Sequence, residues 1–158
     1  MKPHLLATCA AVLAGLGMTA GRAAPAEPVI QWIGIQFATL DRAKAPASAV
    51  SVLVEDLHGL VAAKHDITRG LVLAPDSRSP ELTVPITHGP VIAADLHDFR
   101  VVIELRAADG QNDTWRFNCI VQFHLANGVL IARQIGPCEL QPGKGATATV
   151  AREFHGLR

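Results

Sequence analysis

The chain has 158 residues, of which 49% are hydrophobic and only 4% aromatic, with no tyrosine. Its 14 Lys and Arg residues balance its 14 Asp and Glu residues, so the formal net charge is zero with histidine neutral. This balance, without a local basic cluster, excludes strong electrostatic attraction to nucleic acid or anionic lipid. The length predicts one domain with a core built mainly from Val, Ile, Leu and Ala.

The first 24 residues have the layout of a secretory signal peptide. A short basic start containing Lys2 precedes an alanine-rich apolar run over 5–20, and small residues follow it. We expect cleavage after Ala23, with a second possible site in 24–26. An uncleaved anchor is the alternative, but the small residues after Met18 argue against it. No later segment approaches the roughly 20 uninterrupted apolar residues of a membrane helix. The sequence therefore predicts a signal peptide over 1–24, export to the periplasm or the extracellular space, and a single domain over 25–158.

Beyond the signal peptide the apolar residues repeat with a period of two, which is typical of half-buried strands. In chain order, the first candidate strands cover 29–39, 50–56, 70–74, 81–87 and 101–107, and residues 60–64 are interpreted as a helical turn. Leu96 and Phe99 precede the last of these strands. A leucine followed by an aromatic residue resembles the start of a late strand in immunoglobulin-like and fibronectin-like sandwiches, although Phe99 lacks the usual tyrosine hydroxyl.

The strongest alternation covers 114–125. One face of this strand is apolar and contains Trp115, Phe117, Cys119, Val121, Phe123 and Leu125. Asn127-Gly128 then predicts a hairpin turn and a return strand over 129–135. A two-residue turn would place Cys119 opposite Gly136, whereas a three-residue connection would place it opposite Ile135. The second register gathers more apolar area on one face, so we predict it.

A last candidate strand over 145–154 completes a set of seven to nine short strands. Turn signals separate them about every ten residues, and no long helical pattern occurs. This pattern predicts an all-β fold, an antiparallel β-sandwich of the immunoglobulin or fibronectin type III kind.

Two cysteines, Cys119 and Cys138, remain after removal of the signal peptide. An even pair in an exported protein predicts a disulfide, which would stabilise the fold by roughly 3 kcal/mol by closing a loop of about 20 residues. We expect Gly136-Pro137 to end the return strand and to let Cys138 turn back over Cys119. The alternative is a redox or metal-binding pair, but the spacing lacks the Cys-x-x-Cys arrangement of such sites.

A repeated tripeptide gives the candidate metal ligands. Asp-Leu-His occurs as residues 56–58 and again as residues 95–97. Residues i and i+2 of an extended chain project from one face, so Asp56 with His58, and Asp95 with His97, would each present a carboxylate beside an imidazole. Two such pairs could form a Zn or Cu site. The alternative is that both tripeptides mark solvated strand ends.

No catalytic motif accompanies these residues. The serines lie in no Gly-x-Ser-x-Gly elbow, the carboxylates are scattered, and a glycine-rich phosphate loop is missing. We therefore expect an exported, non-catalytic binding or assembly-accessory protein of the cell envelope, with a protein or glycan partner and no cofactor. The second hypothesis is a periplasmic metal-binding protein, and the third is an uncharacterised hydrolase. A sandwich would present its recognition surface on end loops or on an exposed edge strand.

Overall fold

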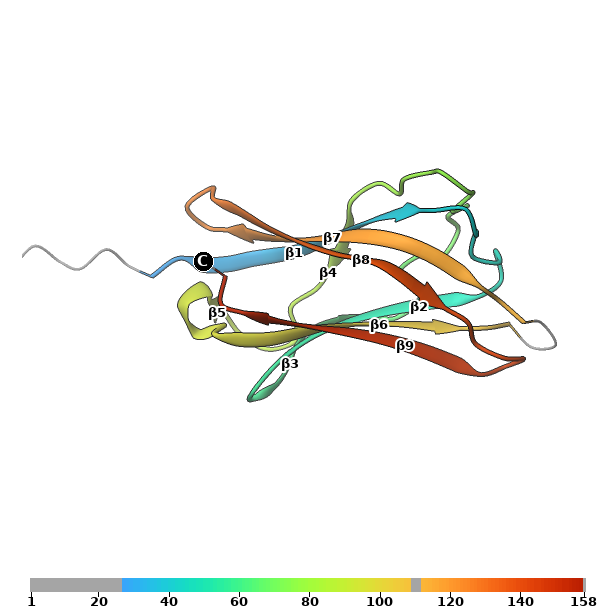
Figure 1. Cartoon of the computed structure of the whole chain (residues 1–158). Helices are drawn as coiled ribbons and strands as arrows, with labels where there is room; N and C mark the ends of the chain where they lie inside the picture. The colour runs from blue at the N-terminus through green and yellow to red at the C-terminus, as the bar shows by residue number, and fades with distance from the viewer. Residues whose placement is uncertain (1–26, 109–111, 158) are drawn as a thin grey trace, which may run out of the picture.

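The computed structural model of the chain describes residues 27–108 and 112–157, so the predicted signal peptide over 1–24 lies outside the described residues. The described part contains nine strands and one short 3-10 helix (Figure 1). In chain order these are β1 (Val29–Thr39), β2 (Ala49–Asp56), β3 (Gly59–Lys64), β4 (Leu82–Val84), β5 (Val91–Ile92), η1 (Ala93–Asp95), β6 (Asp98–Arg106), β7 (Trp115–Leu125), β8 (Leu130–Leu140) and β9 (Thr147–His155).

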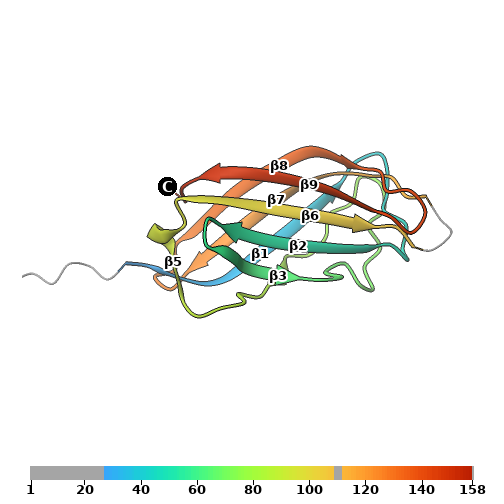
Figure 2. The ribbon, with the colours of Figure 1, turned by 90° about the horizontal axis from the view of Figure 1, so that it is seen from below.

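The strands form two sheets that pack face to face. Sheet A has the order β4-β1-β7-β8, with β5 paired to the start of β1, and sheet B has the order β3-β2-β6-β9. Figure 2 shows the strands of sheet B lying across those of sheet A. The antiparallel pairing confirms the predicted β-sandwich. The immunoglobulin or fibronectin type is not confirmed, because β1 and β2 lie in different sheets, whereas the first two strands of an immunoglobulin domain share one.

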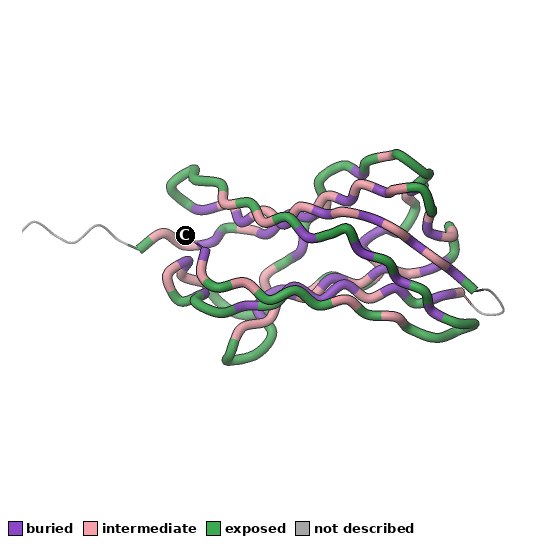
Figure 3. The backbone as a smooth tube through the Cα atoms, in the orientation of Figure 1, coloured by how far each residue is buried: buried purple, intermediate pink, exposed green. Residues whose placement is uncertain are grey.

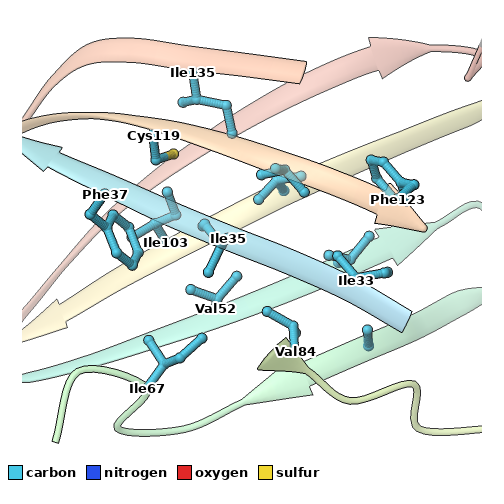
Figure 4. Packing of buried hydrophobic residues seen from close by; sticks show 14 of the residues in the cluster. Ile33, Ile35, Phe37, Val52, Ile67, Val84, Ile103, Cys119, Phe123 and Ile135 are labelled. Carbon is cyan, nitrogen blue, oxygen red and sulfur yellow. The ribbon is translucent and has the colours of Figure 1, made fainter. Parts of the chain in front are cut away.

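The core lies between the two sheets and is built by strict alternation. Every second residue of β7, from Trp115 to Leu125, is buried, as the sequence pattern predicts. Figure 3 shows this alternation of buried and more exposed positions along the strands. In Figure 4, Ile35 and Phe37 of sheet A approach Val52 and Ile103 of sheet B. Each such side chain contributes roughly 1.5–3 kcal/mol by leaving water.

The β7–β8 hairpin has the predicted register. Cys119 lies opposite Ile135, and the N–H of Leu125 donates to the carbonyl of Val129 at 2.9 Å. Gly128 has a φ of 82°, the left-handed conformation that the three-residue connection requires. The prediction that the return strand ends at Gly136-Pro137 is wrong. β8 continues to Leu140 through a register shift, which places Cys138 opposite Phe117.

Three other predictions differ from the structure. Residues 60–64 are not a helical turn, because they belong to β3 and pair with β2. Residues 70–74 form no strand and lie in a turn and loop, in which only Leu73 is buried. The strand predicted over 81–87 is limited to 82–84, since Pro85 has no N–H to donate to a neighbour. Among the described residues, no helix is long and apolar enough to cross a membrane.

Candidate functional site

A groove of about 730 Å³ lies at one end of the sandwich, where β2 turns into β3, β6 begins and β9 ends. Residues 55–60 form one wall, residues 98–100 lie along the floor and residues 153–155 form the other wall. We call this set of residues the groove. The end of the sandwich that carries it is the groove end, and in Figure 1 it is the end at which the C-terminus lies. The opposite end is the far end. The groove opens on the outer face of sheet B.

The first wall is the tip of the β2–β3 hairpin. The carboxylate of Asp56 accepts hydrogen bonds from the N–H groups of His58 and Gly59, at 2.7 and 2.9 Å. These bonds hold the tight turn, in which Gly59 has a φ of 130°. A register shift between Val54 and Glu55 accompanies the turn. The hairpin tip thereby presents Leu57, 80% exposed, and Leu60, 36% exposed, to the solvent beside the groove.

The floor carries a row of charges across three strands. Glu55 of β2 pairs with Arg100 of β6, and Arg100 pairs with Glu153 of β9. The guanidinium of Arg100 donates from Nε to the carboxylate of Glu55. Phe99, next to Arg100 in the chain, points the other way into the core, where it packs on Phe123. The alternation of β6 therefore places this charge row on the outer face.

His155 and Asp98 form a second polar row beside the first. They are register partners on β9 and β6, and His155 Nδ1 lies 2.7 Å from Asp98 Oδ1 in a hydrogen bond. Both side chains are mostly exposed. The hydrogen bond from the imidazole to Asp98 and the charge of that carboxylate raise the pKa of His155, and the charge of Glu153 adds to the effect. The pair is thus an ion pair over a wider pH range than an isolated histidine would allow.

A second hollow of about 500 Å³ lies on the other side of His155, which lines both spaces. Its lining is largely apolar and includes Leu96, Leu157 and the start of the described chain. The chain end that separates the hollows is tied down, because the N–H of Gly156 donates to the carbonyl of His97 and Arg133 donates to the carbonyl of Gly156. His155 therefore projects from a fixed backbone between two concave surfaces.

Exposed apolar side chains also gather at the groove end. Five large hydrophobic side chains are exposed in the part of the chain that the structure describes. Four of them come from the two hairpin tips at this end, Leu57 and Leu60 from sheet B and Val129 and Leu130 from sheet A, and only the sheet B pair lines the groove. The fifth, Val72, lies in the loop between β3 and β4. Exposed apolar patches with polar rims mark interaction surfaces more often than isolated exposed leucines do.

Another histidine forms a cluster on the outer face of sheet A. His124 stacks on Trp32, with ring centroids 3.4 Å apart, and its Nε2 lies 2.8 Å from the carboxylate of Glu81. Glu81 reaches His124 across Gly34, where a Cβ atom would lie 2.0 Å from the Glu81 carboxylate oxygen. The three side chains brace one another across β1 and β7, which accounts for their conformation without a ligand.

The structure divides the predicted metal ligands between the two hollows. Asp56 and His58 line the groove, His97 lines the second hollow, and Asp95 lies in η1. Both tripeptides are thus at the groove end. No three His, Cys, Asp or Glu side chains among the described residues are arranged to hold a metal ion. Asp56 instead holds its own turn, and Zn or Cu binding stays a prediction.

Cys119 and Cys138 are both free thiols in the structure, so the expected disulfide is not formed there. They project into the core from adjacent strands, but Cys119 faces Ile135 and Cys138 faces Phe117. The register shift makes them diagonal neighbours rather than a directly opposed pair. Burial raises the pKa of both thiols, and at Cys138 the charge of Arg152 opposes that effect. Neither sulfur lines the groove.

Sequence reasoning missed the residues that form most of the groove. Asp98, Arg100, Glu153 and His155 are not among the site residues that the sequence predicts. The alternation of β6 and β9 could have placed these side chains on outer faces. The pairing that brings them together joins positions 57 residues apart in the chain, and local patterns carry no such signal.

Comparisons with known proteins do not assign the chain to a family. The chain matches no protein-family model, and neither curated proteins nor solved structures gave a match. The functional argument therefore rests on the groove end itself.

Proposed function

We propose that the protein is an exported, non-catalytic binding or assembly-accessory protein of the cell envelope, and that it binds a partner protein at the groove end. The observation that carries the proposal is a groove with an exposed apolar wall, formed by Leu57 and Leu60, beside a floor and a second wall that carry charged side chains. An apolar centre with a polar rim is the usual anatomy of a protein interface.

The chemistry of the groove supports binding rather than turnover. The His155–Asp98 pair resembles the base and orienting acid of a hydrolase, but covalent catalysis by such a pair needs a nucleophilic side chain within hydrogen-bond reach. No serine, threonine or cysteine is among the described residues that line the groove. The exposed aliphatic side chains of Leu57 and Leu60 offer an apolar contact to a side chain of a partner protein.

Export is tested by the fate of residues 1–24. Expression of the full chain in a secreting host should give a processed protein outside the cytoplasm. N-terminal sequencing should place its first residue near Ala24, because the small residues around Ala23 fit a cleavage site. An unprocessed chain that stays in the cytoplasm would contradict this part of the proposal.

Partner binding is tested by two matched variants. Leu57 and Val72 are similarly exposed, at 80% and 77%, but only Leu57 lies at the groove. With immobilised protein and envelope extract of the native host, wild type and Val72→Ser should retain the same protein after washing, and Leu57→Ser should lose it. Retention that is equal for all three forms, or a glycan as the retained molecule, would contradict a protein interface at this end.

A further inference from the structure

The groove carries more negative than positive charge. Four carboxylates and one guanidinium line it, while its two histidines carry charge only when protonated. The charge of Arg100 is matched by its bond to Glu55. Asp98 is bonded to His155, and Asp56 accepts bonds from its own turn. The remaining carboxylate, that of Glu153, takes no hydrogen bond or ion pair from the residues that the structure describes.

The placement of Glu153 makes its charge available to a bound molecule. It is exposed on β9, the edge strand of sheet B, and its register partner Arg100 turns toward Glu55 on the opposite side. Across the groove from Glu153 lies the apolar wall of Leu57 and Leu60. A ligand that fits both walls must combine a positive charge with an aliphatic part.

Lysine and arginine side chains have this combination, because a stem of methylene groups carries a charged head. We propose that the groove binds a lysine or arginine side chain on an exposed segment of the partner protein. Glu153 contacts its charge, while Leu57 and Leu60 cover its stem. This inference rests on the proposed function and names the chemistry of the partner. The negative charge of the groove also discriminates between partners, since it would repel an acidic segment.

The test uses short peptides of fixed composition and the mature chain. One peptide has a single central lysine among alanines, and the second has norleucine at that position, which keeps the stem and removes the charge. A third has glutamate there. Binding is measured by chemical-shift titration of the protein amides at low ionic strength. We expect the lysine peptide to shift amides of residues 55–60 and 153–155 and to bind more tightly than the norleucine peptide, and the glutamate peptide not to bind.

Two variants of the protein make the test specific. Glu153→Gln keeps the shape of the side chain and removes its charge. Glu104→Gln does the same on the outer face of β6, outside the groove lining. We expect Glu153→Gln to weaken binding of the lysine peptide about three- to fivefold, the range of a partly exposed ion pair, and Glu104→Gln to leave it unchanged. Added salt should weaken binding to wild type more than to Glu153→Gln.

Equal binding of the lysine and norleucine peptides, or equal effects of the two variants, would overturn the basic-residue proposal. The proposed function would still stand if Leu57→Ser alone lost the partner from envelope extract. If neither Leu57→Ser nor Glu153→Gln changed partner retention while the peptides also failed to bind, both proposals would be wrong.

Discussion

The far end of the sandwich buries a lysine and an aspartate, whereas the groove end leaves its charged side chains on the surface. Lys44 is 4% exposed, and its Nζ donates to the carbonyls of Ala45, Pro46 and Ser48. Asp113 is 5% exposed and accepts the N–H of Ala45. At the groove end the side chains of His155 and Asp98 form a hydrogen bond but remain mostly exposed to water.

The difference separates polar groups that hold the fold together from polar groups that we propose to contact a partner. Burial lowers the pKa of Lys44, while the charges of Asp113 and Asp66 oppose this shift, and the ammonium donates hydrogen bonds to three backbone carbonyls. Such a group is committed to the fold. Glu153 takes no comparable bond from the residues that the structure describes, so its charge can contact a partner at little cost to the fold. The same residue types thus have different roles according to what surrounds them.

Trp115→Ala at the far end should have the largest effect on stability. Trp115 is 0% exposed and stacks on Phe117 with centroids 4.1 Å apart, and its Nε1 donates to Thr39. The cavity left behind should lower the free energy of unfolding by about 3–5 kcal/mol, measured by urea denaturation. The counterpart at the groove end is Phe154→Ala. Phe154 is half-buried against Phe99, and we expect a loss of about 1–2 kcal/mol. Equal losses would contradict the difference between the ends.

Lys44→Met should have the second largest effect. The methionine fills the space but leaves the backbone carbonyls that Lys44 serves without a donor, which costs about 1–3 kcal/mol of unfolding free energy. Lys64→Met is the matched control, because Lys64 is exposed at the end of β3. We expect that control to change stability by less than about 0.5 kcal/mol. A neutral Lys44→Met would show that the buried ammonium is dispensable to the fold.

The comparison of the two ends also shows which structural features local sequence patterns are sufficient to predict. The alternation over 114–125 and the Asn127-Gly128 turn determine side-chain direction and register within one hairpin, so both were predictable and were confirmed. The far end was not predicted, since nothing in the local sequence distinguishes a buried Lys44 from a surface lysine. Its burial depends on how the connection between β1 and β2 folds against Asp113, 68 positions along the chain from Ala45.

Two of the four predicted metal ligands lie in the groove for a reason that differs from the predicted one. Asp56 and His58 are there because they form the hairpin tip, and the carboxylate that was assigned to a metal accepts backbone hydrogen bonds instead. The two copies of the tripeptide occupy different structures, the β2–β3 hairpin turn and the segment that joins η1 to β6. The repeat carries no information on the distance between them, which the packing of sheet B determines.

A change of pH should have a smaller effect on the free energy of unfolding, and the groups at the two ends should contribute with opposite signs. The pKa of His155 is raised in the folded chain, so its pairing with Asp98 stabilises the fold fully below the unfolded pKa of about 6.5. That contribution is lost as the pH rises through the raised pKa. The pKa of Lys44 is lowered, so its burial penalty is present at neutral pH and is relieved as the pH rises toward the ordinary lysine range.

Asp98→Asn separates the contribution of His155 to the pH dependence of stability from the contributions of other titrating groups. The substitution removes the charge that His155 faces most closely, and an NMR titration should show the pKa of its imidazole fall toward about 6.5. The loss of stability between acidic and neutral pH should become smaller in the same variant. An unchanged His155 titration would show that Asp98 is not the cause of the raised pKa.

Leu57→Ser should have the smallest effect on stability and a complete effect on partner binding. A leucine that is 80% exposed contributes almost no buried area, so its removal should change the free energy of unfolding by less than about 0.5 kcal/mol. Urea denaturation of Leu57→Ser and Val72→Ser should therefore give the same midpoint as wild type, although only Leu57→Ser loses the partner. A destabilisation of Leu57→Ser by more than about 1 kcal/mol would mean that the hairpin tip packs as part of the fold. The exposed side chains at the groove end would then stabilise the fold, as the buried side chains at the far end do.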